Sequence, residues 1–197
     1  MIRAFIAIEL TDEVRAALGE VQDRLKRAHI GVKVSWVKID NVHLTLQFLG
    51  YVPEDKIRGI SAALERISAA QETFDVPVGG AGAFPNRNRP RVLWVGCHDT
   101  DARMKTLARA VQAAMQEFGF EPEHREFAAH LTLGRVKFPR PDAALTKLLD
   151  SLRDYGCGTL RVDAVHLFES QLNPQGSIYT KLSSHTLKGA VEHGSES

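Results

Sequence analysis

The sequence contains one four-residue phrase twice, His-Leu-Thr-Leu at residues 43–46 and again at residues 130–133. Side chains alternate between the two faces of a β-strand, so in each copy the histidine and the threonine share one face and the leucines share the other. Each copy therefore predicts a strand that is buried on one side and carries an imidazole and a hydroxyl on its open side.

A repeated pair of imidazole and hydroxyl groups suits acid-base chemistry on a phosphodiester. That reaction needs one group to accept a proton, a second to donate one, and hydrogen-bond donors for the oxygens on phosphorus. Imidazole titrates near neutrality, so His43 and His130 can hold opposite protonation states at one pH. Thr45 and Thr132 can donate to the non-bridging oxygens. A single histidine on an apolar strand is more often structural, and the repetition is what favours catalysis.

Phe48 and Arg135 occupy corresponding places after the two threonines. By strict alternation Arg135 would point away from His130. Gly134 intervenes, however, and a glycine within a strand often marks a bulge, which would turn Arg135 toward a bound phosphate. The alternative is a solvated arginine at a strand end. Phe48 could stack on a base, although core packing is the more usual role for a phenylalanine.

Other candidate groups carry weaker signals. Zinc ligation by the two histidines is the competing chemistry, but no cysteine or carboxylate lies at the usual ligand spacing. A basic loop with Arg87, Arg89 and Arg91 could follow an RNA backbone or be solvated charge. The remaining histidines lack a paired hydroxyl and are interpreted as non-catalytic: His29, His98, His124, His166, His185 and His193.

Hydrophobic periodicity places these groups in two similar halves. A strand at 2–10 precedes a helix that Thr11 caps and that extends to Gly31. After a loop at 85–90, a strand at 91–95 precedes a helix capped by Thr100-Asp101. The strand recurs after 88 residues, the helix cap after 89 and the HLTL phrase after 87. These similar offsets indicate an internal duplication, and the alternative is that the match is a coincidence. Two like halves would set the histidine strands across a pseudo-twofold cleft.

The other predicted elements complete each half. We expect further strands at 33–37, 43–49, 74–78 and 160–168, helices that begin at Pro53 and at Asp142, the latter reaching Tyr155, a loop at Gly79-Gly80, and a frayed polar tail from Ser183.

Composition predicts a soluble globular protein. The 197 residues are 44% hydrophobic, enough for a sizeable core, and the net charge of +1 excludes the strongly basic surface of a protein that coats duplex nucleic acid. The start resembles no signal peptide, and no apolar run approaches the roughly 20 residues needed to cross a bilayer. We therefore expect a cytoplasmic monomer in which Cys97 and Cys157 are free thiols.

Several phrases together resemble the two-histidine (2H) phosphoesterase superfamily, and within it the RNA 2′,3′-cyclic phosphodiesterases, also called 2′-5′ RNA ligases. They are the opening RAFIAI at 3–8, Trp36-Val37, NVHLTLQFLG at 41–50 and HLTLGR at 130–135. The resemblance implies an α+β, bilobal fold over residues 1–182, with similar halves at about 1–90 and 91–182. Each half would have a largely antiparallel sheet backed by helices, with the active site in the cleft between the lobes.

The resemblance also implies an activity: hydrolysis of an RNA terminal 2′,3′-cyclic phosphate to a 2′-phosphate, without metal or nucleotide cofactor. It makes His43 the proton donor and His130 the proton acceptor. Thr45, Thr132, Arg135 and Phe48 would then bind the substrate. Two alternatives remain, namely ATP-independent 2′-5′ RNA ligation at the same site and a non-catalytic module that binds RNA or nucleotides.

Overall fold

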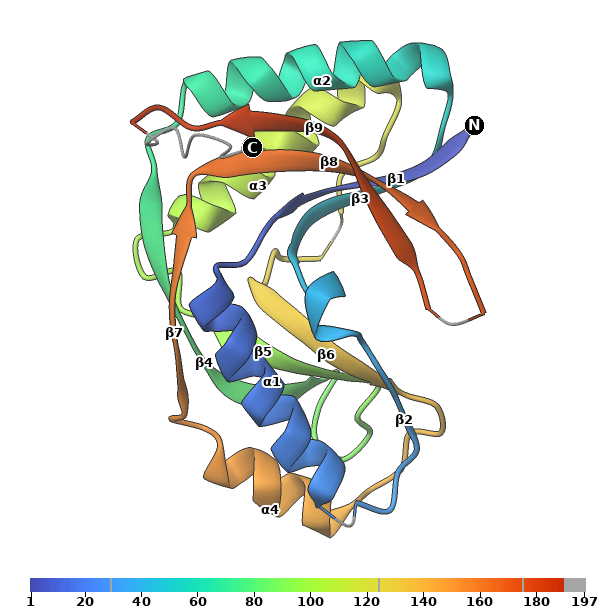
Figure 1. Cartoon of the computed structure of the whole chain (residues 1–197), viewed down its shortest axis with the longest axis vertical. Coiled ribbons are helices and arrows are strands. Elements are labelled where there is room, and N and C mark those ends of the chain that lie inside the picture. The colour runs from blue at the N-terminus through green and yellow to red at the C-terminus, as the bar shows by residue number, and fades with distance from the viewer. Residues whose placement is uncertain (29, 124, 175, 190–197) are drawn as a thin grey trace, which may run out of the picture.

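The computed structural model describes residues 1–28, 30–123, 125–174 and 176–189, whose strands form two sheets backed by α-helices (Figure 1). The strands are β1 (Ile2–Ile8), β2 (Val34–Trp36), β3 (Leu44–Val52), β4 (Phe74–Phe84), β5 (Val92–Cys97), β6 (His130–Val136), β7 (Gly156–Val162), β8 (Ala164–Gln171) and β9 (Ile178–Thr186). The helices are α1 (Asp12–Arg27), α2 (Glu54–Ala69), α3 (Arg103–Met115) and α4 (Ala143–Ser151), with 3-10 turns η1 (Ile39–Asn41) and η2 (Gln116–Phe118).

The two sheets do not divide the chain at its midpoint. One has the strand order β3-β1-β8-β9 and the other β2-β6-β5-β4-β7, and all neighbouring strands are antiparallel. Strands β8 and β9 thus join β1, while β2 and β4 join β5 and β6. The helices cross over too, since α1 packs against β7 and α3 packs against α2 and β3.

We call the β3-β1-β8-β9 sheet with α2 and α3 the first lobe, and the other sheet with α1 and α4 the second lobe (Figure 1). The α+β, two-lobed fold that the sequence predicted is confirmed. Each lobe, however, contains elements from both halves of the sequence, so the lobes are interleaved and are not two independent repeats.

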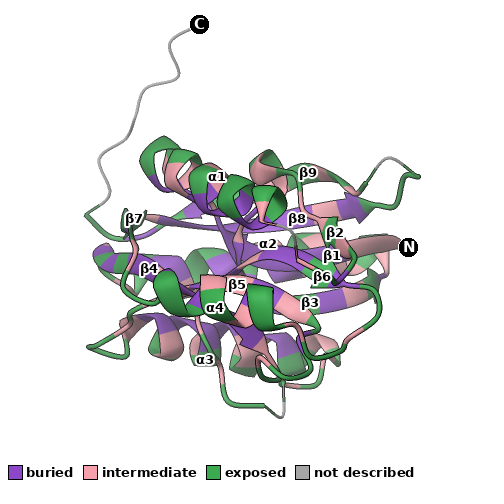
Figure 2. Cartoon of the chain, turned by 90° about the horizontal axis from the view of Figure 1, so that it is seen from below, coloured by how far each residue is buried: buried purple, intermediate pink, exposed green. Residues whose placement is uncertain are grey.

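One continuous group of buried apolar residues extends through both lobes. Ile6 in the first lobe and Leu131 in the second have no exposed surface. Figure 2 shows the buried residues on the strands and on the inner sides of the helices. Cys97 and Cys157 are free thiols, as expected. Because alternate residues of β3 and β6 insert into this core, the opposite faces of both strands remain open.

Two helices begin where local capping predicted. The Oγ1 of Thr11 accepts a hydrogen bond from the backbone N–H of Val14 (3.4 Å) at the start of α1. The carboxylate of Asp142 accepts one from the N–H of Leu145 (3.0 Å) at the start of α4. Each such cap stabilises the protein by about 1 kcal/mol. Helix α4 ends at Ser151, before the predicted end at Tyr155.

Helix α3 starts later than expected, and its predicted cap at Thr100-Asp101 is wrong. The carboxylate of Asp99 accepts hydrogen bonds from the backbone N–H groups of Met104 (3.0 Å) and Lys105 (2.8 Å). Ala102, at φ 55°, has a left-handed backbone that turns the chain back over Asp99. A carboxylate outside the predicted cap therefore satisfies the first turn of the helix.

Strand β4 is longer than predicted and includes Gly79-Gly80, which was expected to be a loop. A Cβ at Gly79 would lie 2.7 Å from the carbonyl oxygen of Tyr155. The glycine therefore permits a close approach within the sheet, and the chain does not turn there. The predicted strand at 160–168 is in fact two strands, β7 and β8, which belong to different sheets.

The predicted polar tail also begins too early. Strand β9 pairs with β8 as far as Thr186, and Leu187 is only 2% exposed. Ser183 is therefore part of the first lobe, because backbone pairing and the burial of Leu187 hold this segment. Residues 190–197 of the predicted tail lie outside the described residues.

Candidate active site

The two HLTL segments lie in different lobes and meet at the boundary between them. His130 begins β6, and His43 directly precedes β3, which contacts β6. Thr45 and His130 line one cavity of about 590 Å³, which we call the larger cavity. Thr132 alternates with buried leucines and so shares the open face of His130. The structure thus brings the paired motifs together across a cleft.

The bulge expected beside Gly134 is present in β6. Two adjacent residues of β5 pair with Thr132 and Gly134, so Leu133 is an extra residue on β6. This one-residue shift puts Arg135 on the open side of the strand with His130, where it is exposed between buried neighbours.

Strand β3 has the same irregularity, which the sequence did not predict. Two adjacent residues of β1 pair with Thr45 and Gln47, so Leu46 is the extra residue. Phe48 is consequently on the open side and 62% exposed. Core packing, the more usual role for a phenylalanine, is therefore wrong for Phe48, because the bulge turns its ring out of the core.

Two glutamines that the sequence analysis missed support these bulges. Gln22 of α1 is 2% exposed and donates from Nε2 to the carbonyl oxygens of Leu133 (3.0 Å) and Val37 (2.7 Å). Gln112 of α3 donates from Nε2 to the carbonyl oxygen of Leu46 (3.3 Å). The helix of each half thus holds the bulge of the other half. Their separation of 90 residues, close to the offset of the repeat, was the available signal.

Both histidine rings are oriented by the same kind of hydrogen bond. The Nδ1 of His43 lies 2.8 Å from the carbonyl oxygen of Asn41, and the Nδ1 of His130 lies 2.7 Å from that of Ala128. A carbonyl oxygen can only accept, so Nδ1 carries the proton in both rings. Among the described residues, neither Nε2 atom forms a hydrogen bond, so each is available to a bound molecule.

The surroundings of the two imidazoles differ. His43 stacks on Phe5 with ring centroids 4.5 Å apart and meets the ring of Tyr179 edge-on at 5.3 Å. Burial lowers the pKa of His43 to about 4, against the opposing effect of its hydrogen bond to Asn41. In the ligand-free protein at pH 7, His43 is therefore neutral and its Nε2 is an acceptor. His130 meets a single ring edge-on, that of Phe84, at 5.0 Å.

A second cavity lies on the other side of Phe48. This smaller cavity, of about 260 Å³, is lined by Phe48 and Arg135 together with two residues that sequence reasoning missed, Arg3 and Tyr179. Arg3 could have been found from the sequence, because strand alternation places it on the same face of β1 as Phe5, the residue that stacks on His43. Tyr179 carried no such signal, since only the fold brings β9 to the cleft.

One arginine of the basic loop at residues 87–91 forms an ion pair within the protein. Arg87 pairs with the carboxylate of Asp150, a contact that the sequence analysis did not predict. Arg87 also lines a third cavity, of about 470 Å³, next to Trp94. Neither histidine and neither threonine of the repeated phrase borders that cavity, so we place the candidate site at the cleft between the lobes.

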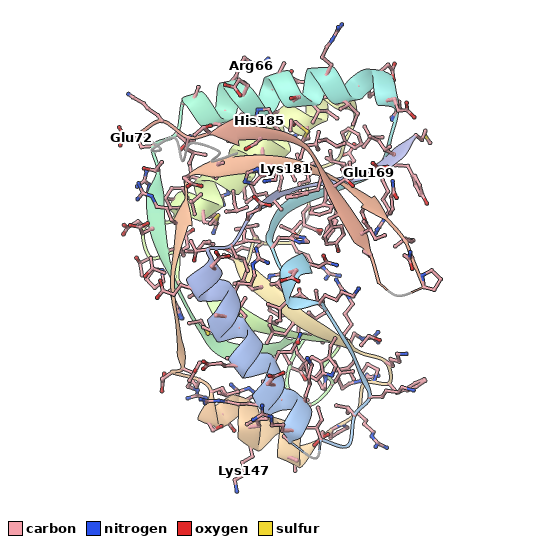
Figure 3. All side chains as sticks on the ribbon, in the orientation of Figure 1. Arg66, Glu72, Lys147, Glu169, Lys181 and His185 are labelled. Carbon is pink, nitrogen blue, oxygen red and sulfur yellow. The ribbon has the colours of Figure 1, made fainter. Side chains whose placement is uncertain are left out.

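The other described histidines lie away from this cleft or have structural partners. His98 is exposed directly after β5. His185 is buried between β9 and α2, with Nδ1 2.8 Å from the carboxylate of Glu65 and Nε2 2.9 Å from the Oγ of Ser183 (Figure 3). Burial lowers the pKa of His166 to about 4. His29, His124 and His193 lie outside the described residues.

The described residues contain neither a cluster of metal ligands nor a membrane-spanning helix. No three His, Cys, Asp or Glu side chains gather there as a metal site would require. None of the helices in those ranges is long and apolar enough to span a bilayer.

Comparison with known proteins adds independent findings. The model of a family described as LigT-like phosphoesterase matches the chain twice, over residues 8–94 and 95–179. The RNA 2′,3′-cyclic phosphodiesterase of Methanothermobacter thermautotrophicus is 38% identical over 92% of this chain and 96% of that protein. The protein of the same name from Thermotoga maritima is 35% identical over 96% of this chain and 98% of its own length.

Solved structures agree with this similarity. A crystal structure of a Thermus thermophilus protein superimposes with a TM-score of 0.77 at 30% identity, covering 95% of this chain and 98% of that one. The crystal structure of Escherichia coli LigT with 3′-AMP gives a TM-score of 0.74 at 25% identity, with the same coverage of 95% and 98%.

Proposed function

The chain belongs to the LigT-like phosphoesterase family, and from that premise we propose that it hydrolyses the 2′,3′-cyclic phosphate at an RNA end to a 2′-phosphate. The observation that carries the proposal is the matched pair His43 and His130, each with Nδ1 held by a carbonyl and Nε2 left for the substrate. Relatives named for this activity, at 38% and 35% identity, support it.

The reaction is an in-line displacement at phosphorus. One imidazole removes a proton from water as the new P–O bond forms, and the other donates a proton to the 3′ oxygen as the P–O3′ bond breaks. Thr45 and Thr132 donate hydrogen bonds to the non-bridging oxygens, whose negative charge grows in the transition state. No step requires a metal ion or a nucleotide cofactor.

We assign the proton donor role to His43 and the acceptor role to His130, as the family resemblance implies. Because burial lowers the pKa of His43 to about 4, this residue does not hold the catalytic proton in the ligand-free protein at pH 7. An anionic cyclic phosphate beside the ring favours the imidazolium form and raises that pKa. In this proposal, His43 takes up its proton as the substrate binds.

Phe48 and Arg135 complete the proposed binding surface. The exposed ring of Phe48 can stack on a nucleobase, and Arg135 can pair with a phosphate. RNA ends with a cyclic phosphate are thus the proposed partners. The monomeric state, the cytoplasmic location and the single-domain organisation stay predictions.

The test uses a short RNA that ends in a 2′,3′-cyclic phosphate, with excess chelator and no ATP. We expect the wild type to form a single 2′-monoester, detected by phosphorus NMR. His43→Ala and His130→Ala should each lower kcat by about 100- to 10,000-fold, because each removes a general acid or base. The double variant should lower kcat by far less than the product of the two single fold reductions, because the two histidines act as a unit. His98→Ala, an exposed histidine outside the cleft, is the matched control.

Other outcomes would replace this proposal. Near wild-type turnover by either variant would refute the two-histidine mechanism, and so would a need for added metal. Joining of two RNA ends in place of hydrolysis would favour the ligase alternative. Binding without any conversion would favour a non-catalytic module, and a mixture of 2′- and 3′-monoesters would contradict a fixed geometry at phosphorus.

A further inference from the structure

The smaller cavity brings together two arginines from different lobes. Arg3 comes from β1 and Arg135 from β6, and both line this space of about 260 Å³. Among the described residues, neither arginine forms an ion pair, and no aspartate or glutamate lines the cavity. Two guanidinium groups without a counter-charge make the cavity attractive to an anion.

A residue that lines the smaller cavity also restrains one of the two guanidinium groups. The Nη1 of Arg3 donates a hydrogen bond to the Oγ of Ser170 (3.0 Å), which restrains the side chain. Among the described residues, the other N–H groups of Arg3 form no hydrogen bond. Ser177 and Tyr179 from the β8–β9 hairpin border the same space. Restrained donors bind an oxyanion with a smaller entropy cost than free side chains do.

The two cavities beside Phe48 differ in charge. The larger cavity is lined by three glutamates and one arginine, namely Glu121, Glu123, Glu126 and Arg125. Glu126 is paired with Lys105, so Glu121 and Glu123 outweigh the single arginine. The smaller cavity has the two arginines and no carboxylate. Phe48 borders both. The larger cavity therefore repels a polyanionic RNA backbone that extends from the reaction centre, and the smaller cavity attracts it.

The smaller cavity also lies at a suitable distance from the reaction centre. Arg135 is three residues beyond Thr132 on the open face of β6, as Phe48 is beyond Thr45 on β3. Because each interval contains a bulge, Thr132 and Arg135 pair with residues of β5 that are only two positions apart, and Thr45 and Phe48 do the same on β1. At about 3.3 Å per residue, this places the cavity roughly 7 Å along the strands from the threonines. An arginine side chain at that separation can reach the phosphate that neighbours the reacting phosphate in an extended single strand.

We propose that Arg3 and Arg135 bind the 5′-phosphate of the nucleotide that carries the cyclic phosphate, which in a longer RNA is the phosphodiester to the preceding nucleotide. The base of that nucleotide lies against Phe48, and the 5′ part of the RNA leaves the cleft past the β8–β9 hairpin. This inference rests on the proposed function and makes an RNA end a better substrate than a free cyclic nucleoside phosphate.

The experiment compares adenosine 2′,3′-cyclic phosphate carrying a 5′-hydroxyl with the same compound carrying a 5′-phosphate. We expect the wild type to favour the 5′-phosphate in kcat/KM by roughly ten- to a hundredfold, the effect of charge-assisted hydrogen bonds. Arg3→Gln should bring this ratio close to one, and Arg3→Lys should give an intermediate ratio because the charge remains without the planar fork. Arg66→Gln, the same charge loss on the outer side of α2 (Figure 3), should leave the ratio unchanged.

A binding measurement separates failure of this inference from failure of the proposed function. Calorimetry with adenosine 2′-phosphate and adenosine 2′,5′-bisphosphate makes the same comparison without turnover, and thermal unfolding confirms that each variant is folded. A wild type without preference for the 5′-phosphate, or an Arg3→Gln variant that keeps it, overturns the anion site. A preference in binding that Arg3→Gln removes, together with no hydrolysis, supports the anion site and overturns only the proposed hydrolysis.

Discussion

His43 and His130 have equivalent hydrogen bonds but unequal surroundings, and a proton-transfer mechanism needs such a difference. In both rings a carbonyl oxygen two residues earlier binds Nδ1, so Nε2 is the nitrogen available for proton exchange. Only His43 is packed among the aromatic rings of the first lobe, with Phe5 stacked on it at 4.5 Å. The environment of each ring, more than its motif, sets when it carries a proton.

The proton-donor assignment can be tested with a substrate whose 3′ bridging oxygen is replaced by sulfur. A thiolate leaves without protonation far more readily than an alkoxide, since a thiol has a pKa near 8.5. We expect sulfur to restore most of the activity that His43→Ala loses and little of the activity that His130→Ala loses. Turnover of the oxygen and sulfur substrates by both variants gives the answer, and rescue of His130→Ala alone would exchange the two roles.

Burial of His43 also predicts how stability depends on pH. Its pKa is about 4 in the folded protein. An unperturbed histidine has a pKa of about 6.5, so between those values the unfolded state binds more protons. The free energy of unfolding should therefore fall as pH decreases from 6.5 to 4, by roughly 3 kcal/mol from this residue. Urea denaturation at pH 7 and pH 4 should show a smaller loss for His43→Gln than for the wild type. Equal losses would mean that the folded protein does not disfavour protonated His43.

At the scale of elements, the bulge of β6 depends on a close contact with β2. A Cβ at Gly134 would lie 2.7 Å from Cγ1 of Val34 and 2.9 Å from Cε3 of Trp36. We expect Gly134→Ala to lower the free energy of unfolding by about 1–3 kcal/mol, as overpacking does. The displacement of β2 and the bulge should also lower kcat/KM, because Arg135 follows directly.

Gly156→Ala is the matched control for that substitution. Gly156 also lies in a β-strand, but nothing is within 4 Å of an added Cβ there. Its effect on unfolding, measured by urea denaturation, should stay within about 0.5 kcal/mol. Equal stability of the two variants would show that β2 moves aside without cost.

At the scale of the whole molecule, the exchange of strands predicts that neither half of the sequence folds alone. A fragment of residues 1–90 contains β1 and β3 but lacks β8 and β9, and its β4 has no β5 or β7 to pair with. We expect fragments 1–90 and 91–182 to show little native circular dichroism separately, and the full chain to unfold in one cooperative transition. A folded 1–90 fragment would contradict this dependence.

The sequence alone determined the local motifs of this protein better than it determined the long-range contacts around them. The HLTL repeat, the Thr11 cap and the apolar stripes are local patterns, and local patterns decide strand faces, helix starts and the residues that enter the core. The bulge at Gly134 was also predictable, because a glycine inside a strand is a local signal. From such features the sequence predicts that His43 and His130 act as a pair, and this remains a prediction.

Only the tertiary structure decided which strands share a sheet and what surrounds each imidazole. The sequence halves repeat, but β8 and β4 exchange lobes, and this long-range pairing depends on the whole core and has no local pattern. The same pairing brings Tyr179 to His43 and Arg3 to Arg135, side chains from strands far apart in the sequence. The low pKa of His43 follows from that burial, which explains why two identical motifs acquire different chemical properties in one cleft.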